Sequence, residues 1–183
     1  MLATLTQNAS PISQSTKATH ILVVLPKPGK VLDKHQNKLD FLGKDILEVL
    51  LSRRRMSLGE IGDTPVAANL GSGALCAWVT VDSGKSPFEQ QTSVRKAMQL
   101  LLEENPAETH IAIYGNMDEK RAFAELAVYA AWINGSMLPL RKTSKKKSDR
   151  KSLARIVLHG YKDADNFAVS QAKAEGNLLT REL

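Results

Sequence analysis

The sequence predicts an α/β protein with one mixed, mainly parallel sheet that is covered by helices on both faces. Short apolar segments rich in β-branched residues alternate along the chain with longer segments in which apolar residues recur every three or four positions. The strand-like segments are far enough apart in sequence for the crossover connections that parallel strands require. This alternation is typical of a layered α/β sheet, and no internal repeat is visible.

The composition is that of an ordinary folded domain. The chain has 183 residues (20.0 kDa), of which 43% are hydrophobic and 24% charged, and these proportions exclude a collagen, a disulfide-rich scaffold and a wholly disordered chain. A chain of this length can bury a core without help from a metal or a disulfide. Its single thiol, Cys76, lies in an apolar strand-like segment and is expected to be buried and inert. One domain, or one domain with a tail, is expected.

The first predicted strand and helix follow a polar leader. Residues 1–18 lack apolar periodicity and are expected to form a flexible or loosely attached leader. The continuous apolar run at 20–25 predicts a buried strand, which the proline- and glycine-containing segment 26–29 ends. A helix is expected from residue 39 to the three arginines at 53–55, where cations favour the negative end of the helix dipole. Its predicted buried stripe consists of Leu39, Leu42, Ile46 and Val49.

A hairpin and a second helix are expected next. Two strand-like segments, 66–70 and 74–81, flank a Gly-Ser-Gly sequence, which fits a hairpin or a bend between successive strands. Ser86 and Pro87 then open a helix, because proline is favoured at the first helical position. The inner face of this helix is predicted to carry Val94, Met98 and Leu101.

Two further strands and two helices complete the pattern. Residues 110–114 predict a strand, and a helix is expected from about 119 to 134 with Gly135 just beyond its end. The inner stripe of that helix is predicted to consist of Ala122, Leu126, Tyr129 or Ala130, and Ile133. Residues 153–158 again have strand character. A last helix is expected from about 163 to the end, with Phe167, Gln171, Ala174 and Leu178 on one face.

One short segment carries the whole net charge of +6. Residues 141–151 hold seven basic side chains and one acidic one, whereas the rest of the chain holds 18 of each sign. Clustered cations bind phosphate backbones with marked salt dependence, but this segment has no aromatic residue to stack on single-stranded bases. A solvated connecting loop and a nucleic-acid-binding loop both stay open, and the arginines at 53–55 would extend the patch if the fold brought them near. The candidate nucleic-acid-binding residues are Arg141, Lys142, Lys145, Lys146, Lys147, Arg150 and Lys151.

The sequence offers no catalytic or metal-binding motif. The four histidines are too far apart in sequence for metal-ligand spacing, and no HExxH motif is present. His20, His110 and His159 lie at predicted strand ends and are expected to be hydrogen-bonded structural residues, whereas His35 is expected to be solvated in a turn. The glycine-containing segments 71–73 and 82–86 could hold a phosphate on their backbone amides. Neither matches a nucleotide-binding motif, so plain turns are favoured.

The last helix resembles a segment of the leucyl (cytosol) aminopeptidases. In that family an alanine-rich helix with an acidic residue or alanine before a glycine, and an arginine and a leucine near its end, is followed at once by an Asn-x-Pro-x-Asn turn. The order of strands and helices from about His20 onward also resembles the N-terminal domain of the family. The matching residues of the helix are Glu175, Gly176, Asn177, Leu178, Arg181 and Leu183, and the chain ends where the turn would begin.

The resemblance implies a macro-domain-like fold for residues 19–162, with the basic loop at 141–151, and a linker helix at 163–183 toward a C-terminal catalytic domain that is missing from the chain. Two divalent metal ions, zinc or manganese, and their Lys, Asp and Glu ligands belong to that domain in the family. No catalytic residue, metal ligand or cofactor is therefore expected in this chain.

The same resemblance implies a parent enzyme that removes N-terminal amino acids from peptides and assembles as a homohexamer. DNA is a partner of some bacterial members of the family. The alternative is a stand-alone macro-like module that binds a nucleotide or a nucleic acid, since sheets of this kind present a ligand crevice at the carboxyl ends of their strands.

A cytoplasmic location without a membrane partner is expected. The first 15 residues lack the charged beginning and apolar core of a signal peptide. No apolar run approaches the roughly 18 residues that a membrane-spanning helix needs. A single cysteine also agrees with a reducing compartment.

Overall fold

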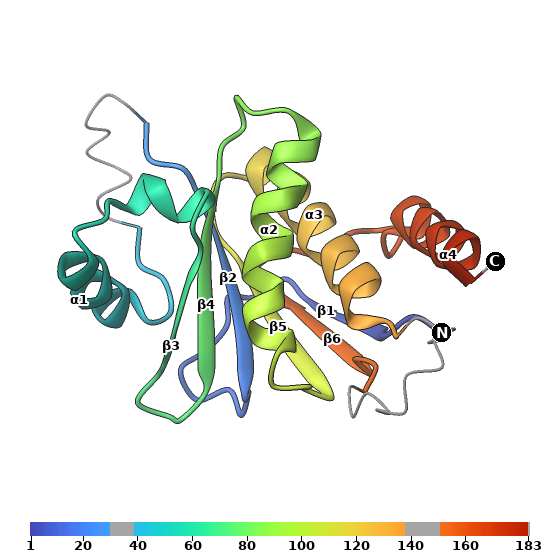
Figure 1. The fold of residues 1–183 in the computed structure, drawn as a ribbon, viewed down its shortest axis with the longest axis horizontal. Coiled ribbons are helices and arrows are strands. Elements are labelled where there is room, and N and C mark those ends of the chain that lie inside the picture. The colour runs from blue at the N-terminus through green and yellow to red at the C-terminus, as the bar shows by residue number, and fades with distance from the viewer. Residues whose placement is uncertain (30–38, 138–150, 183) are drawn as a thin grey trace, which may run out of the picture.

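The computed structural model describes residues 1–29, 39–137 and 151–182, which form a six-stranded sheet with helices on both faces (Figure 1). The strand order is β1-β6-β5-β2-β4-β3, with β3 antiparallel to β4 and all other neighbours parallel. The predicted fold class is confirmed. The strands are β1 (Thr4–Asn8), β2 (His20–Pro26), β3 (Val66–Asn69), β4 (Leu75–Val81), β5 (Glu108–Ile113) and β6 (Arg155–His159). The helices are α1 (Lys44–Arg54), the 3-10 helix η2 (Leu58–Gly62), α2 (Pro87–Leu102), α3 (Met117–Gly135) and α4 (Ala168–Glu182).

The central strands β2 and β4 place successive side chains in two separate apolar cores. Leu22 and Val24 of β2 join the core under α2 and α3, whereas Ile21 and Val23 join the core under α1. All four side chains are buried. A strand that is buried on both faces has no polar positions to alternate with, which explains the continuous apolar run that predicted β2.

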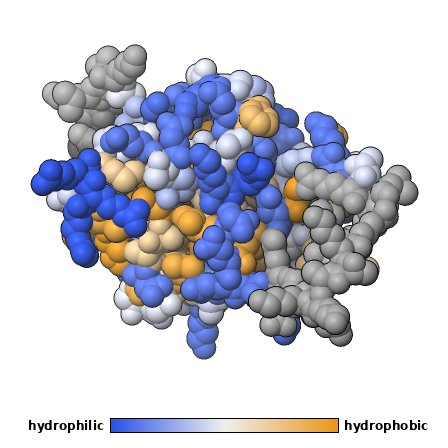
Figure 2. Space-filling view, in the orientation of Figure 1, coloured by the Kyte–Doolittle hydropathy of each residue, from blue (hydrophilic) through white to orange (hydrophobic). Residues whose placement is uncertain are grey.

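Helices α2 and α3 cover one face of the sheet, and α1 with η2 covers the other (Figure 1). The predicted inner residues of α2, Val94, Met98 and Leu101, are fully buried. On the opposite face, Leu47 and Ile61 are buried against Trp78 of β4. Figure 2 shows hydrophilic side chains over much of the face in view, with an apolar area between α1 and α2.

The prediction of a flexible leader at residues 1–18 is wrong for β1. Residues Thr4–Asn8 pair in parallel with β6, and Thr4 lies opposite Arg155 in the register. Three of the strand's residues, Thr4, Thr6 and Asn8, are exposed, so the segment has the polar composition of a sheet edge. Its partner strand lies about 150 residues later in the chain, and no local pattern could indicate the pairing.

The predicted stripe of α1 is correct only in part, since Ile46 packs against the core and Val49 does not. Val49 is 62% exposed, and the buried residues of the helix are Leu47 and Leu51. The helix begins only at Lys44, so Leu39 and Leu42 belong to the preceding segment and pack there instead of on the helix face. The predicted end of the helix near the arginines is confirmed, with Arg55 as its C-cap.

The stripe predicted for α3 is correct only in part, since Ala130 is buried as one of the two alternatives predicted. Ala122 is exposed, and Leu126, Tyr129 and Ile133 are only half-buried, whereas the residues toward the sheet are fully buried. These buried residues are Phe123, Ala124, Ala127, Val128, Ala130, Ala131 and Trp132. Leu126 and Tyr129 line a groove beside α4. The apolar residues of α3 therefore lie on two faces of the helix, one toward the sheet and one toward this groove.

Gly135 and α4 differ from prediction at their boundaries. Gly135 is the last residue of α3, and an added Cβ would lie 2.8 Å from the Cβ of Leu153, so glycine permits a close approach there. Helix α4 begins at Ala168, after a turn at residues 164–167. Ala174 and Leu178 are buried as predicted. Among the helices of the described ranges, none is long and apolar enough to span a membrane.

Candidate functional site

The carboxyl ends of β2, β4 and β5 define the place where a ligand would bind in a sheet of this topology. The chain leaves β2 toward α1 on one face, and it leaves β4 and β5 toward α2 and α3 on the other. Connections that diverge in this way open a crevice at the strand ends in α/β proteins. The loop from β4 to α2, residues 82–86, lies at this edge and is one of the two phosphate-binding candidates from the sequence.

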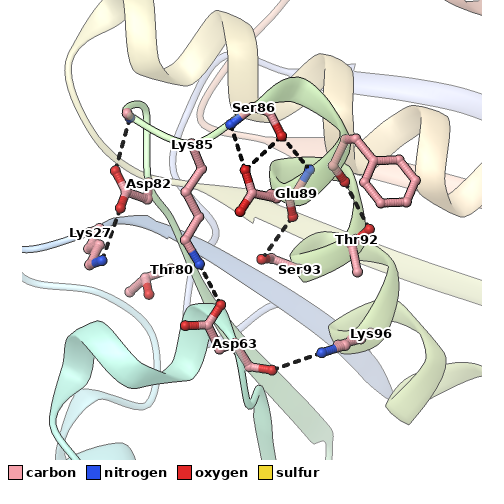
Figure 3. A network of polar contacts seen from close by, with 12 residues as sticks. Lys27, Asp63, Thr80, Asp82, Lys85, Ser86, Glu89, Thr92, Ser93 and Lys96 are labelled. Atoms are coloured by element: carbon pink, nitrogen blue, oxygen red, sulfur yellow. Dashed lines mark hydrogen bonds and ion pairs between the residues drawn. The ribbon is translucent and has the colours of Figure 1, made fainter.

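The β4–α2 loop is folded around two carboxylates of the chain itself (Figure 3). Ser86 is the N-cap of α2, and its backbone N–H donates to Oε2 of Glu89 over 3.0 Å. The Ser86 hydroxyl donates to the same oxygen over 2.7 Å. The backbone N–H of Gly84 donates to Oδ1 of Asp82 over 2.9 Å. These two carboxylates occupy amides that a phosphate would need.

Three lysines complete this network from both sides of the loop (Figure 3). Lys27, just after β2, contacts Asp82 with its Nζ 2.9 Å from Oδ2. Lys85 contacts Asp63 with an Nζ–Oδ1 distance of 2.5 Å, and Lys96 of α2 donates to the carbonyl oxygen of Asp63 over 3.1 Å. The network therefore joins the end of β2, the end of η2 and the start of α2.

The same contacts keep the carboxylates ionised. The hydrogen bond from Lys85 lowers the pKa of Asp63, and the hydrogen bond from Lys27 lowers that of Asp82. The hydrogen bonds from Ser86 lower the pKa of Glu89. Lys27 and Lys85 are each paired with a carboxylate, and Lys96 donates to a backbone carbonyl, so all three ammonium groups are engaged by partners in the chain. The geometry supports the plain-turn interpretation of 82–86.

The second phosphate candidate, 71–73, is the turn of the β3–β4 hairpin. The N–H of Gly73 donates to the carbonyl oxygen of Leu70 over 2.8 Å, and the N–H of Leu70 donates to that of Ala74 over 2.8 Å. Gly73 has a φ of 86°, a left-handed conformation that glycine adopts without cost. The hairpin turn accounts for Gly73 without a ligand.

Two histidines form a buried pair that the sequence did not indicate. His110 of β5 and His159 of β6 stack with ring centroids 5.2 Å apart, and Nδ1 of His110 lies 2.9 Å from Nε2 of His159. Nε2 of His110 lies 2.9 Å from Oε1 of Glu108, which also accepts a hydrogen bond from Arg155 through its other oxygen. A carboxylate only accepts, so Nε2 of His110 carries a proton, and in the neutral pair His159 donates to Nδ1 of His110.

The histidines are hydrogen-bonded at strands, as predicted. His20 at the start of β2 lies 2.9 Å from Oε2 of Glu104. His35 lies outside the described residues. The prediction for Cys76 is confirmed, because its thiol is fully buried and burial raises its pKa far above the ordinary value. In the part of the chain that the structure describes, no three His, Cys, Asp or Glu side chains come together in a way that could hold a metal ion.

The basic segment lies almost entirely outside the described residues. Arg141, Lys142, Lys145, Lys146, Lys147 and Arg150 fall in the range 138–150, and Lys151 is exposed. The arginines at 53–55 are exposed at the end of α1, which packs on the β3–β4 side of the sheet. Lys151 precedes β6, which lies next to the edge of the sheet opposite β3. Lys151 and the arginines therefore do not share one patch.

Comparisons with known proteins identify structural neighbours only. No protein-family model matches the chain, and no curated protein sequence matches it. A solved structure of the bottromycin maturation enzyme BotP in complex with Mn is similar with a TM-score of 0.50 and 17% identity, over 91% of this chain and 32% of that one. A mutant of the leucine aminopeptidase from tomato is similar with a TM-score of 0.52 and 14% identity, over 95% of this chain and 36% of that one.

These neighbours define the class of fold that the chain shares. Both similarities extend over nearly the whole chain, so the arrangement of strands and helices is that of a segment found in leucine aminopeptidase-like proteins. The chain spans about a third of the length of each neighbour. At these identities the similarity concerns the fold alone.

Removal of the N-cap hydroxyl tests the structural role of the β4–α2 loop. Ser86→Ala should lower the free energy of unfolding by about 1 kcal/mol, because the first turn of α2 loses its side-chain cap. Urea denaturation followed by circular dichroism measures the change. Ser83→Ala, in the exposed part of the same loop, is the matched control and should leave stability unchanged. Equal stability of the two variants would contradict a structural role for the cap.

The histidine pair predicts a pH dependence of stability. Burial, together with the neighbouring His110, lowers the pKa of His159 below the ordinary 6.5. As the pH falls through 6.5, the unfolded chain takes up a proton before the folded chain does, so the free energy of unfolding decreases. Urea titrations at about pH 7.5 and about pH 5.5 should show this loss, and His159→Gln should reduce it.

The control for the pH prediction is His20→Gln, which removes an imidazole that is hydrogen-bonded to Thr19 and Glu104 instead of to the pair. This variant should retain the wild-type loss of stability between the two pH values. If His159→Gln and His20→Gln changed the pH dependence equally, the buried pair would not be its source.

Proposed function

We propose that the chain is the non-catalytic N-terminal domain of a metal-dependent leucyl aminopeptidase, serving assembly or regulation of the enzyme. The observation that carries the proposal is the asymmetric coverage: more than nine-tenths of this chain is similar in structure to about a third of each of two aminopeptidase-like chains. The sequence of α4 supports the same assignment independently, since residues 175–183 match the helix that precedes the catalytic domain in that family.

The chemistry of the described residues supports a non-catalytic role. A two-metal hydrolase holds its ions with clustered carboxylates and uses them to polarise a carbonyl and activate water. The carboxylates at the strand ends here are engaged by lysines and backbone amides, and Asp63, Asp82 and Glu89 form three separate contacts instead of one cluster. These residues do not fit a two-metal site. The zinc or manganese ions would belong to the C-terminal part of the proposed parent.

The assembly around this domain follows from the same proposal. The C-terminal catalytic domain would be its partner within the chain, and a homohexamer in the cytoplasm would be the working enzyme. The exposed half of α4 is available for the connection, because only one stripe of the helix is buried.

The alternative, a macro-like module that binds a nucleotide, has less support from the geometry. Its expected phosphate position is filled by Glu89 and Asp82. Nucleic-acid binding through the basic segment stays a separate expectation, because it depends on the charge of 141–151 and not on the strand-end crevice.

Two measurements test the proposed function. The purified chain should not hydrolyse leucine p-nitroanilide with added manganese or zinc. An immunoblot of the source cells with an antibody against this domain should show a band well above 20.0 kDa. Immunoprecipitation of that larger protein should recover metal-dependent hydrolysis, which serves as the positive control. A native band at 20.0 kDa, or metal-dependent turnover by the pure chain, would contradict the proposal.

The basic segment predicts salt-dependent DNA binding. If the domain binds duplex DNA, affinity should fall steeply between about 50 and 200 mM salt, because each neutralised phosphate releases counterions. Replacing Lys145, Lys146 and Lys147 together by alanine should weaken binding and reduce the salt slope. Fluorescence anisotropy measures both quantities. Replacing the three arginines at 53–55 is the comparison, since they are exposed but lie at the opposite side of the sheet from Lys151. Binding that survives the lysine replacements would exclude the segment as the DNA site.

A further inference from the structure

The connection between β6 and α4 contains two consecutive residues in a left-handed conformation. Asn166 has a φ of 54° and Phe167 a φ of 55°. Asparagine tolerates this region, but a bulky residue such as phenylalanine is rarely found there because its Cβ crowds the backbone. Such conformations persist only where the surrounding structure enforces them. Contacts around this turn must therefore stabilise it.

Part of that stabilisation comes from Asp163 within the turn. Its Oδ2 atom accepts hydrogen bonds from the backbone N–H groups of Asp165, over 3.1 Å, and Phe167, over 2.9 Å. The side chain of Phe167 is buried, with its ring centroid 6.3 Å from that of Tyr161. The turn is thus anchored at its last residue by both the backbone and the side chain.

The remaining contacts come from the opposite end of the chain. Gln7 of β1 accepts a hydrogen bond from the N–H of Asp163 through Oε1, over 2.8 Å. Its Nε2 donates to Oδ1 of Asn166 over 2.7 Å and to the carbonyl oxygen of Asp163 over 3.4 Å. One side chain of the N-terminal strand therefore contacts the turn at three points. We refer to Gln7, Asp163 and Asn166 as the Gln7 latch.

The turn determines where α4 goes. Helix α4 stands beside α3 and away from the sheet (Figure 1). Its buried residues form a single stripe, Ser170, Ala174 and Leu178, and the Ser170 hydroxyl donates to Oε1 of Glu125 on α3 over 2.6 Å. Because α4 packs through one face only, against α3, its direction depends on the turn that precedes it.

We propose that the Gln7 latch couples the N-terminal strand to the position of α4. While β1 is paired with β6, Gln7 holds the strained turn closed and α4 stays against α3. Strand β1 lies at one edge of the sheet with a neighbour on one side only, so it can detach at a lower cost than the interior strands. Detachment withdraws Gln7, the turn relaxes from its left-handed conformation, and α4 leaves α3. The coupling is a property of this fold and holds whether or not the chain belongs to an aminopeptidase.

Hydrogen–deuterium exchange of the whole chain tests this coupling. Gln7→Ala removes all three contacts to the turn, so exchange in α4 should accelerate by about tenfold or more, given the net contribution of a few hydrogen bonds. Thr6→Ala is the matched control: Thr6 is the neighbouring residue of β1, is exposed and points to the opposite face, so exchange in α4 should stay at the wild-type rate. Exchange in β2 reports on the rest of the fold and should be unchanged in both variants.

A second variant separates the effect of backbone strain in the turn from the effect of the hydrogen bonds that Gln7 makes. Asn166→Gly removes an acceptor of the latch but also the cost of one left-handed residue. In that background the added replacement Gln7→Ala should accelerate exchange in α4 less than it does in the wild type, because the turn no longer needs the same restraint. Wild-type exchange of α4 in Gln7→Ala would overturn the proposal. So would equal acceleration in α4 and β2, because the replacement would then act on the whole fold and not on the latch.

Discussion

The burial of β2 and β4 on both faces is the constraint on which the rest of the structure depends. A parallel sheet has no solvated face at its centre, so each strand must supply apolar side chains in both directions. The alternation of Leu22 and Val24 with Ile21 and Val23 fills two cores, and helices are needed over each. The chain must therefore leave β2 on one side and β4 on the other. That divergence creates the edge where a ligand would bind in related topologies.

At that edge, ion pairs and hydrogen bonds between side chains of this chain connect neighbouring strands and helices. Lys27, Lys85 and Lys96 connect to Asp82 and Asp63, and the first turn of α2 is capped by Ser86 and Glu89. Phosphate-binding loops leave such amides free, whereas here they are satisfied by carboxylates of the same chain. The edge thus links helices that cover opposite faces of the sheet. This is consistent with the proposal of a non-catalytic domain.

Prediction from the sequence succeeded where the signals were local. The apolar run of β2, the hairpin around the Gly-Ser-Gly turn and the Ser86-Pro87 start of α2 each depend on residues that are neighbours in the chain. It failed where burial depended on distant partners. Strand β1 is polar because it is an edge. The stripe of α1 was misassigned because the helix begins only at Lys44, and that of α3 because this helix has more than one apolar face. The periodicity of a helix shows which residues share a face, but not which face a neighbour covers.

By itself the sequence determined the α/β class, most strands and helices, the buried thiol and the concentration of positive charge in 141–151, because composition and spacing carry these properties along the chain. Only the tertiary structure decided the pairing of His110 with His159, the engagement of the strand-end lysines and the contact of Gln7 with the turn before α4. These contacts join residues 22 to 159 positions apart. Their formation depends on the order of strands in the sheet, and no local interaction encodes that order.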